Sequence, residues 1–181
     1  MAEADAAMCG QNVPLSGARG AETIRIMATL NGVGRTFDAE PRTTLAEALR
    51  GTLGLTGTKI ACDRGSCSAC TVLFDGLPVC SCMMLAIEAD GHRITTIEGL
   101  AAATVLHPVQ NAFIEHDALQ CGFCTPGLIM SCVALLERNA NPDQEAVLDA
   151  ISGHFCRCGT YPHVVAATLA AAAKMRGDDN G

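Results

Sequence analysis

The feature that most constrains this chain is its cysteine content, with eleven cysteines among 181 residues. Ten of them lie between residues 62 and 158, mostly in tight groups. Neither a secretory signal nor a twin arginine is visible near the first residue, so we expect a cytoplasmic protein. Disulfides are rare in that compartment. Closely spaced cysteines in such a chain predict metal ligands.

Charge and hydropathy exclude several other classes of protein. The formal net charge is −7, which argues against nucleic acid or an anionic membrane as the partner. No apolar run approaches the roughly 18 residues of a membrane span. Hydrophobic residues make up 49% of the chain, enough for a packed core without covalent staples.

The first half of the chain reads as a small α+β unit. Residues 24–30 alternate apolar and polar, and a turn at 31–32 predicts a hairpin with residues 34–37. Thr44 and Glu47 form a capping box for a short helix over 45–50, which Gly51 can end. A second hairpin is expected over 71–74 and 77–82, followed by a strand over 94–97. We predict a flexible arm at 1–23 and a ferredoxin-like domain of the β-grasp type at 24–98.

From about residue 99 the periodicity becomes helical. Helices are expected over 109–116, over 127–138 with Thr125 as its cap and Pro126 at its first position, from Asn141-Pro142 onward, and over 163–174. Four short helices with many small residues predict a compact four-helix bundle over 99–176. The last residues, 177–181, are expected to be disordered.

The first cysteine group has the spacing Cys62-x4-Cys67-x2-Cys70, with a fourth ligand farther on. This is the plant-type [2Fe–2S] spacing, whereas a zinc site would favour two separated C-x2-C pairs. Backbone amides of such a glycine-containing loop can stabilise the negative sulfurs. Both Cys80 and Cys82 could be the fourth ligand: on one strand they would share a face, so the residues alone do not choose between them.

The second group comprises Cys121-x2-Cys124 and Cys156-x-Cys158. Each pair precedes an expected helix, so two helix N-termini, which favour thiolates, would converge on one centre. Such a set fits zinc or an iron–sulfur cluster, and the first group beside it favours the cluster. Outside the two groups, Cys9 is expected to be a free thiol and Cys132 a core residue. The five histidines show no metal pairing, and we expect His154 and His163 to be solvated or hydrogen-bonded.

Three runs of residues resemble a known family. They are Gly54-Leu55-Thr56-Gly57-Thr58-Lys59 with the Cys62–Val72 segment, then Leu119-Gln120-Cys121-Gly122-Phe123-Cys124-Thr125-Pro126-Gly127, then Cys156-Arg157-Cys158. They are similar to motifs of the small iron–sulfur subunits of the xanthine oxidase, or molybdenum hydroxylase, family, over roughly residues 24–172. Ser68 departs from the usual glycine, Ala61 stands where glycine is common, and Gly159-Thr160-Tyr161-Pro162 replaces the more usual Thr-Gly-Tyr.

The resemblance implies the ligand sets and the chemistry. It implies that Cys62, Cys67, Cys70 and Cys82 hold one [2Fe–2S] cluster and that Cys121, Cys124, Cys156 and Cys158 hold a second. The second cluster would face the molybdopterin of a large subunit, in its cytosine dinucleotide form, and Gln120 would hydrogen-bond that pterin. Electrons would pass from molybdopterin through both clusters to a flavin subunit or a cytochrome carrying FAD or haem.

This chain is therefore expected to be the electron-transfer subunit of a multi-subunit oxidoreductase whose substrate chemistry takes place on another subunit. Three alternatives stay open from the residues. They are a free-standing two-cluster ferredoxin-like carrier, a zinc-bound interaction module and a cluster-based redox sensor. The acidic charge and the lack of a recognisable DNA-binding element oppose the sensor.

Overall fold

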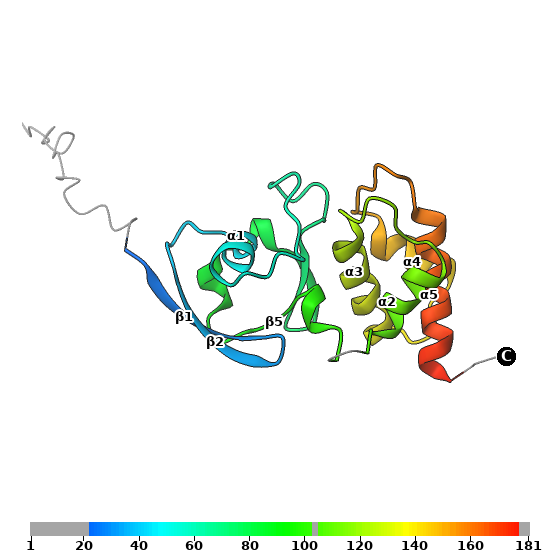
Figure 1. Ribbon diagram of the computed structural model, residues 1–181, viewed down its shortest axis with the longest axis horizontal. Coiled ribbons are helices and arrows are strands. Elements are labelled where there is room, and N and C mark those ends of the chain that lie inside the picture. The colour runs from blue at the N-terminus through cyan, green and yellow to red at the C-terminus, as the bar shows by residue number, and fades with distance from the viewer. Residues whose placement is uncertain (1–21, 103–104, 178–181) are drawn as a thin grey trace, which may run out of the picture.

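The computed structural model describes residues 22–102 and 105–177. Figure 1 shows two units side by side, one built around a sheet and one built of helices. Most of the predicted arm and tail, and Cys9, lie outside the described residues. The predicted α+β class, a sheet domain followed by a helical domain, is confirmed.

The sheet begins with the predicted hairpin of β1 (Ile24–Leu30) and β2 (Val33–Ala39). Asn31 and Gly32 both have positive φ, 51° and 79°, as the two-residue turn of a twisted hairpin requires. Alternate β1 residues, among them Ile26 and Leu30, are buried against the helix that follows. The alternation read from the sequence therefore sets the buried face of this strand.

Three further strands complete the sheet: β3 (Thr71–Phe74), β4 (Leu77–Cys80) and β5 (Arg93–Thr95). The strand order is β2-β1-β5-β3-β4, and only the β1–β5 pair among these is parallel. The second predicted hairpin is confirmed, but β4 ends at Cys80 and a 3₁₀ turn, η3 (Ser81–Met83), follows. Cys80 and Cys82 thus do not share a strand, and the prediction of one strand over 77–82 is wrong.

The first helix lies across the sheet, as predicted, with Thr44 and Glu47 forming its capping box. α1 (Leu45–Glu47) continues without a break into a π-helical turn, η2 (Ala48–Thr52). Gly51 lies inside this turn and does not end the helix, contrary to the prediction. The wider turn brings Leu45 and Leu49 into the same core as the sheet, and the chain reverses at Gly54, whose φ is +69°.

Short 3₁₀ turns flank β5 along the chain. Within the sheet unit, η4 (Ala86–Ala89) precedes β5, and η5 (Ile97–Gly99) leads from β5 toward the helices. η5 includes Ile97, which the sequence placed in the strand predicted over 94–97. Our domain boundary at 98/99 falls in this region and stays a prediction.

The helical unit contains α2 (Pro108–Glu115), α3 (Thr125–Arg138), α4 (Gln144–Ile151) and α5 (Tyr161–Arg176). The predicted cap Thr125 and the predicted helix start at Asn141-Pro142 are wrong by one or two residues. Cys124, not Thr125, is the N-cap of α3, and Asp143 caps α4 by accepting from the Ala146 amide. Among the described residues, no helix has the length and apolar character needed to cross a bilayer.

The two units pack through α3 and β3. Leu73 of β3 belongs to the core of the helical unit, and Gly127 of α3 lies so close to the other unit that a Cβ there would come within 2.4 Å of the Ser68 carbonyl oxygen. A side chain at position 127 would push the helix away, so glycine sets the close approach of the two units.

Candidate metal centres

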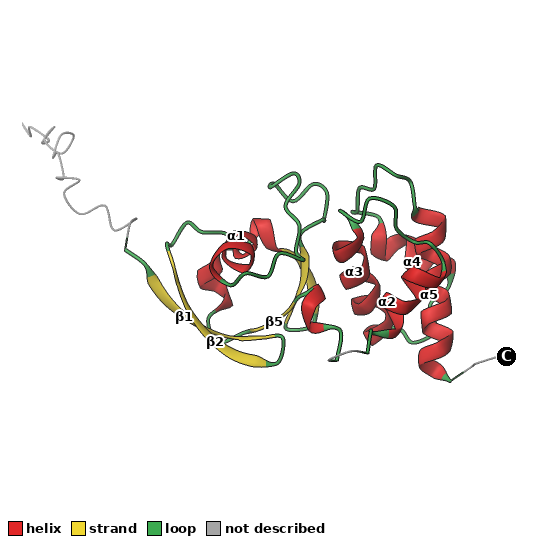
Figure 2. Ribbon diagram, viewed as in Figure 1, coloured by secondary structure: helices red, strands yellow, loops and turns green. Residues whose placement is uncertain are grey.

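The first cysteine group lies on a loop without helix or strand between η2 and β3, drawn in green at the centre of Figure 2. Asp63, Gly65 and Ser68 have positive φ, which folds the loop tightly around its own sulfurs. The Ser66 amide donates to Cys62 Sγ at 3.2 Å, and the Gly65 amide donates to Cys82 Sγ at 3.4 Å. Such N–H groups stabilise negative charge on sulfur.

The four predicted ligands of this group meet as two pairs. The Cys62 and Cys67 side chains lie close enough for Cys67 to affect the pKa of Cys62, and Cys82 likewise affects the pKa of Cys70. The first pair is half-buried and the second is buried. A [2Fe–2S] cluster needs two thiolates on each iron, so this pairing fits a dinuclear centre.

The structure separates Cys82 from Cys80. Cys82 lies on the 3₁₀ turn under the loop and accepts from Gly65, whereas Cys80 lies at the end of β4 with its sulfur 3.7 Å from Ser68 Oγ. This arrangement supports Cys82 as the fourth ligand, which remains our prediction.

Local surroundings set the ionisation of two of these thiols in opposite directions. A hydrogen bond from the Arg64 backbone, above all, lowers the pKa of Cys62 to about 7. Burial, with smaller contributions from Cys82 and Cys80, raises the pKa of Cys70 to about 12. The loop therefore favours the thiolate form of Cys62, whereas the buried Cys70 thiolate needs a cation to stabilise it.

The second group also comes together from separate segments. Cys124 stands at the N-cap of α3, and Cys156 and Cys158 precede α5, whose N-cap is Thr160. The side chains of Cys156 and Cys121 lie near that of Cys124, close enough to affect its pKa. Burial raises the pKa of Cys124 to about 12.

Cys156 is held by two residues that sequence reasoning did not assign to the site. Thr160 Oγ1 lies 3.3 Å from Cys156 Sγ. Burial alone would raise the pKa of Cys156, but hydrogen bonds, above all from Thr160, together outweigh burial and lower this pKa to about 7. The Cys156 amide donates to Tyr161 Oη at 2.7 Å, and that hydroxyl donates to the His154 carbonyl at 2.9 Å. Thr160 and Tyr161, which follow Cys158 closely, were the sequence signal for these contacts. From the sequence alone they were interpreted only as a departure from a motif.

Each group offers four free cysteines, and four thiolates, two on each iron, are the donor set of a [2Fe–2S] cluster. Within residues 22–102 and 105–177, no three His, Cys, Asp or Glu side chains are placed to hold one metal ion.

The two cysteine groups touch each other. The Phe155 amide donates to the Cys67 carbonyl at 3.2 Å, which joins the residue before Cys156 to a predicted ligand of the first group. His154 beside it is buried, and its Nε2 lies 2.7 Å from Ser131 Oγ of α3. His163 Nδ1 lies 2.9 Å from the His116 carbonyl. Both histidines are hydrogen-bonded within the protein.

Gln120 lies at the surface beside the exposed Cys121. Leu119 and Phe123 on either side are also exposed, by 39% and 46%. An apolar hollow of about 260 Å³ lies next to them, with Leu106, Ile114 and Leu119 among its lining residues. This edge of the second centre is thus open and largely apolar.

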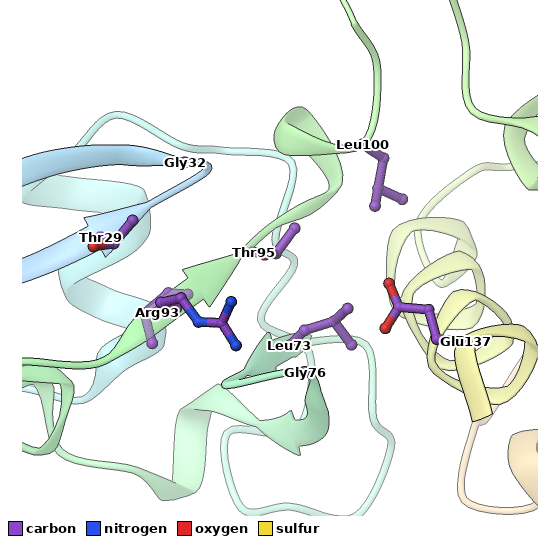
Figure 3. A pocket seen from close by; sticks show the side chains of 9 residues that line it. Thr29, Gly32, Leu73, Gly76, Arg93, Thr95, Leu100 and Glu137 are labelled. Atoms are coloured by element: carbon purple, nitrogen blue, oxygen red, sulfur yellow. The ribbon is translucent and has the colours of Figure 1, made fainter.

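Another cavity, of about 280 Å³, lies where the two units meet (Figure 3). Arg93 of β5 and Glu137 of α3 lie on opposite sides of it, with Leu73 between them. No cysteine lines it, so this cavity is separate from both metal centres.

Both units of this chain match families of known proteins. Residues 28–93 match the family described as 2Fe-2S iron-sulfur cluster binding domain, and residues 96–169 match the [2Fe-2S] binding domain family. The nicotine 6-hydroxylase small subunit of Paenarthrobacter nicotinovorans is 46% identical over 88% of this chain and 96% of its own length. The nicotinate dehydrogenase small FeS subunit of Eubacterium barkeri is 44% identical over 80% of this chain and 92% of its own.

A solved structure agrees with these relatives. Quinoline 2-oxidoreductase from Pseudomonas putida 86 contains a chain that is 45% identical and superposes with a TM-score of 0.81. The match covers 86% of the present chain and 98% of that one. The two [2Fe–2S]-binding domains, their order and the length of the match all coincide, and this chain therefore belongs to the small iron–sulfur subunits of the xanthine oxidase, or molybdenum hydroxylase, family.

Proposed function

We propose that this subunit relays electrons between a large partner subunit that holds molybdopterin and a flavin subunit or cytochrome. The ligands we assign are Cys62, Cys67, Cys70 and Cys82 for the first cluster and Cys121, Cys124, Cys156 and Cys158 for the second. When bound, the clusters supply one-electron carriers, and the protein positions and insulates them. The contact between the two cysteine groups is the observation that carries this proposal.

That contact offers a short route between the centres. From Cys67 the route runs through its carbonyl, the 3.2 Å hydrogen bond to the Phe155 amide, and one peptide bond to Cys156. Gly127 keeps the two units close enough for this bond, because any side chain there would meet the Ser68 backbone. Tyr161 fixes the Cys156 side of the route through its hydroxyl.

Both ends of the route are exposed to solvent. Gln120 and Cys121 are exposed at the apolar edge of the helical unit, which suits a large subunit and its pterin. At the other end, the Cys62 loop exposes Asp63, Arg64 and Ser66, and Met83 beside Cys82 is 63% exposed. We assign this second surface to the flavin or cytochrome acceptor.

We place the complex in the cytoplasm. The ten cysteines of the described part are free, and four-thiolate iron sites suit a reducing compartment. The acidic charge of the chain, −7, supports a protein partner over nucleic acid.

The test is substrate-driven cluster reduction in the complex purified from its host. Gln120→Ala should leave both clusters intact, because Gln120 is exposed and is not a ligand, but should slow their reduction by substrate in stopped-flow absorbance or lower pterin occupancy. Leu148→Ala, an exposed apolar change on α4, is the control and should leave the rate unchanged. Unchanged rate and occupancy in Gln120→Ala would remove Gln120 from the pterin edge.

The rival reading is a free-standing two-cluster carrier. It predicts a soluble, stable monomer that co-purifies with no molybdenum protein. The apolar edge at Leu119 and Phe123 favours the subunit, because an obligate interface is apolar at its centre.

A further inference from the structure

Ser68 occupies a backbone conformation that normally favours glycine. Its φ is +54°, in the left-handed region, although it carries a side chain. Its carbonyl accepts from the Thr71 amide at 3.1 Å and from Thr71 Oγ1 at 2.7 Å, and Gly127 of α3 packs against the same oxygen. The backbone of Ser68 is therefore held firmly between Cys67 and Cys70.

That hydroxyl faces Cys80, the cysteine of this region that we do not assign as a ligand. Ser68 Oγ lies 3.7 Å from Cys80 Sγ, within hydrogen-bond range for sulfur. Gly153 of the helical unit lies over the pair, because a Cβ there would come within 3.3 Å of Ser68 Oγ. Both side chains are half-buried under this cover.

Cys80 in turn packs beside the first centre. It contacts the buried group formed by Ala46, Cys70 and Cys82. The next residue, Ser81, ties this end of β4 to Cys70, donating to its carbonyl from the amide at 3.3 Å and from Oγ at 2.7 Å. The Cys80 side chain therefore packs against the group that contains two assigned ligands, and a thiol is both a weak donor and a weak acceptor.

We propose that Ser68 and Cys80 form a hydrogen-bond relay that raises the reduction potential of the first cluster. The Ser68 hydroxyl donates to Cys80 Sγ, and the Cys80 thiol donates to the Cys70 thiolate. The reduced cluster carries one more negative charge than the oxidised one, so donors near its sulfurs stabilise the reduced state. This inference rests on the ligand assignment of the proposed function. Ser68 and Cys80 are positioning residues in it, because they act on the cluster through Cys70.

The experiment is an EPR-monitored redox titration of both clusters in the anaerobically purified complex, with mediators and dithionite in place of substrate. Ser68→Gly removes the hydroxyl and suits the positive φ, so it should fold well. Cys80→Ala removes the thiol. Each variant should make the reduction equilibrium of the first cluster less favourable by up to about tenfold. For one electron this is a decrease of about 59 mV in its reduction potential. The double variant should match Cys80→Ala alone, because the two groups act in series.

Cys132→Ala is the matched control, since Cys132 is another unassigned cysteine with a hydroxyl partner, Thr168 Oγ1 at 3.1 Å. It is buried in the helical core and should leave both potentials unchanged. Three results would each overturn the relay. They are an unchanged first-cluster potential in Ser68→Gly and Cys80→Ala, additive shifts in the double variant, and loss of the first EPR signal in Cys80→Ala. Because dithionite replaces substrate, these outcomes do not depend on the electron donor assigned in the proposed function.

Discussion

At the scale of single residues, the backbone between Cys80 and Cys82 determines which sulfur faces the first cysteine loop. β4 ends at Cys80, and the 3₁₀ turn that follows rotates Cys82 beneath the loop, where it accepts the Gly65 amide. A continuous strand would have placed both sulfurs on one face. The turn therefore gives the two cysteines different partners although they stand two residues apart.

Substitution of each cysteine by serine tests this assignment. The parent complex should contain about four iron and four sulfide per small subunit. Cys82→Ser should lose or badly perturb the first EPR signal and about half of this iron, because a ligand is gone, while the second signal stays. Cys80→Ser should retain both signals. The reverse pattern, measured by iron analysis and EPR, would show that Cys80 is the ligand.

The cysteine groups could be predicted from the sequence because spacing limits which sulfurs a short loop can bring together. The roles of Thr160 and Tyr161 could not, because their contacts with Cys156 depend on how the 156–160 turn closes on the start of α5. Ser68 was noticed only as a departure from glycine. Its contact with Cys80 joins two segments of one unit, and its cover by Gly153 needs the second unit.

At the scale of elements, α3 connects the two centres. Its N-cap is Cys124, its Gly127 packs on the Ser68 backbone, and its Ser131 lies 2.7 Å from His154 Nε2. The sequence predicted the helix from its apolar face and Pro126, and it predicted the hairpins from alternation and turn residues. It could not predict the π-helical turn through Gly51, because that turn is selected by packing of Leu49 against the sheet rather than by local propensity.

Gly127→Ala tests the role of α3. The added Cβ would lie 2.4 Å from the Ser68 carbonyl oxygen, so the helix must move, and we expect a loss of about 1–3 kcal/mol in the free energy of unfolding. Because the shift would lengthen the Phe155–Cys67 contact, magnetic interaction between the two reduced clusters should weaken in EPR spectra.

Gly51→Ala is the control for this change. Gly51 lies inside a helical turn with open space around its Cβ position, so the substitution should change stability by no more than about 1 kcal/mol and should leave the spectra unaltered. Equal behaviour of the two variants would mean that α3 is not held by contact with the Ser68 backbone.

At the scale of the whole molecule, two apolar cores meet the assigned ligands at their edges, at Cys124 and Cys156 in the helical unit and where Ala46 packs with Cys70 and Cys82. One core is formed by the sheet and α1, with Ile26 and Leu45 at its centre, and another by the four helices, with Phe113 and Leu128. The cysteine loops lie outside these elements and come together at the same edge of the molecule (Figure 1). We therefore expect the centres of the cores to form without metal, whereas the loops depend on their sulfurs.

Removal of iron by an anaerobic chelator tests this division. The loop between Thr52 and Thr71 contains no helix or strand, and the Gly65 and Ser66 amides donate to sulfur atoms that the clusters would hold in place. Without the clusters, the buried thiols of Cys70 and Cys124 should return to the neutral form, since burial raises the pKa of each to about 12. The loops then lose the metal bonds that join their cysteines to one another. Hydrogen exchange measured by mass spectrometry should accelerate in peptides covering residues 56–69 and 153–160, while peptides from the centre of α3 and from β1 stay protected and far-UV circular dichroism changes little. Loss of protection throughout α3 and β1 would mean instead that the clusters hold the cores together. Unchanged exchange in both loops would mean that the assigned cysteines do not bind the metal that organises these loops.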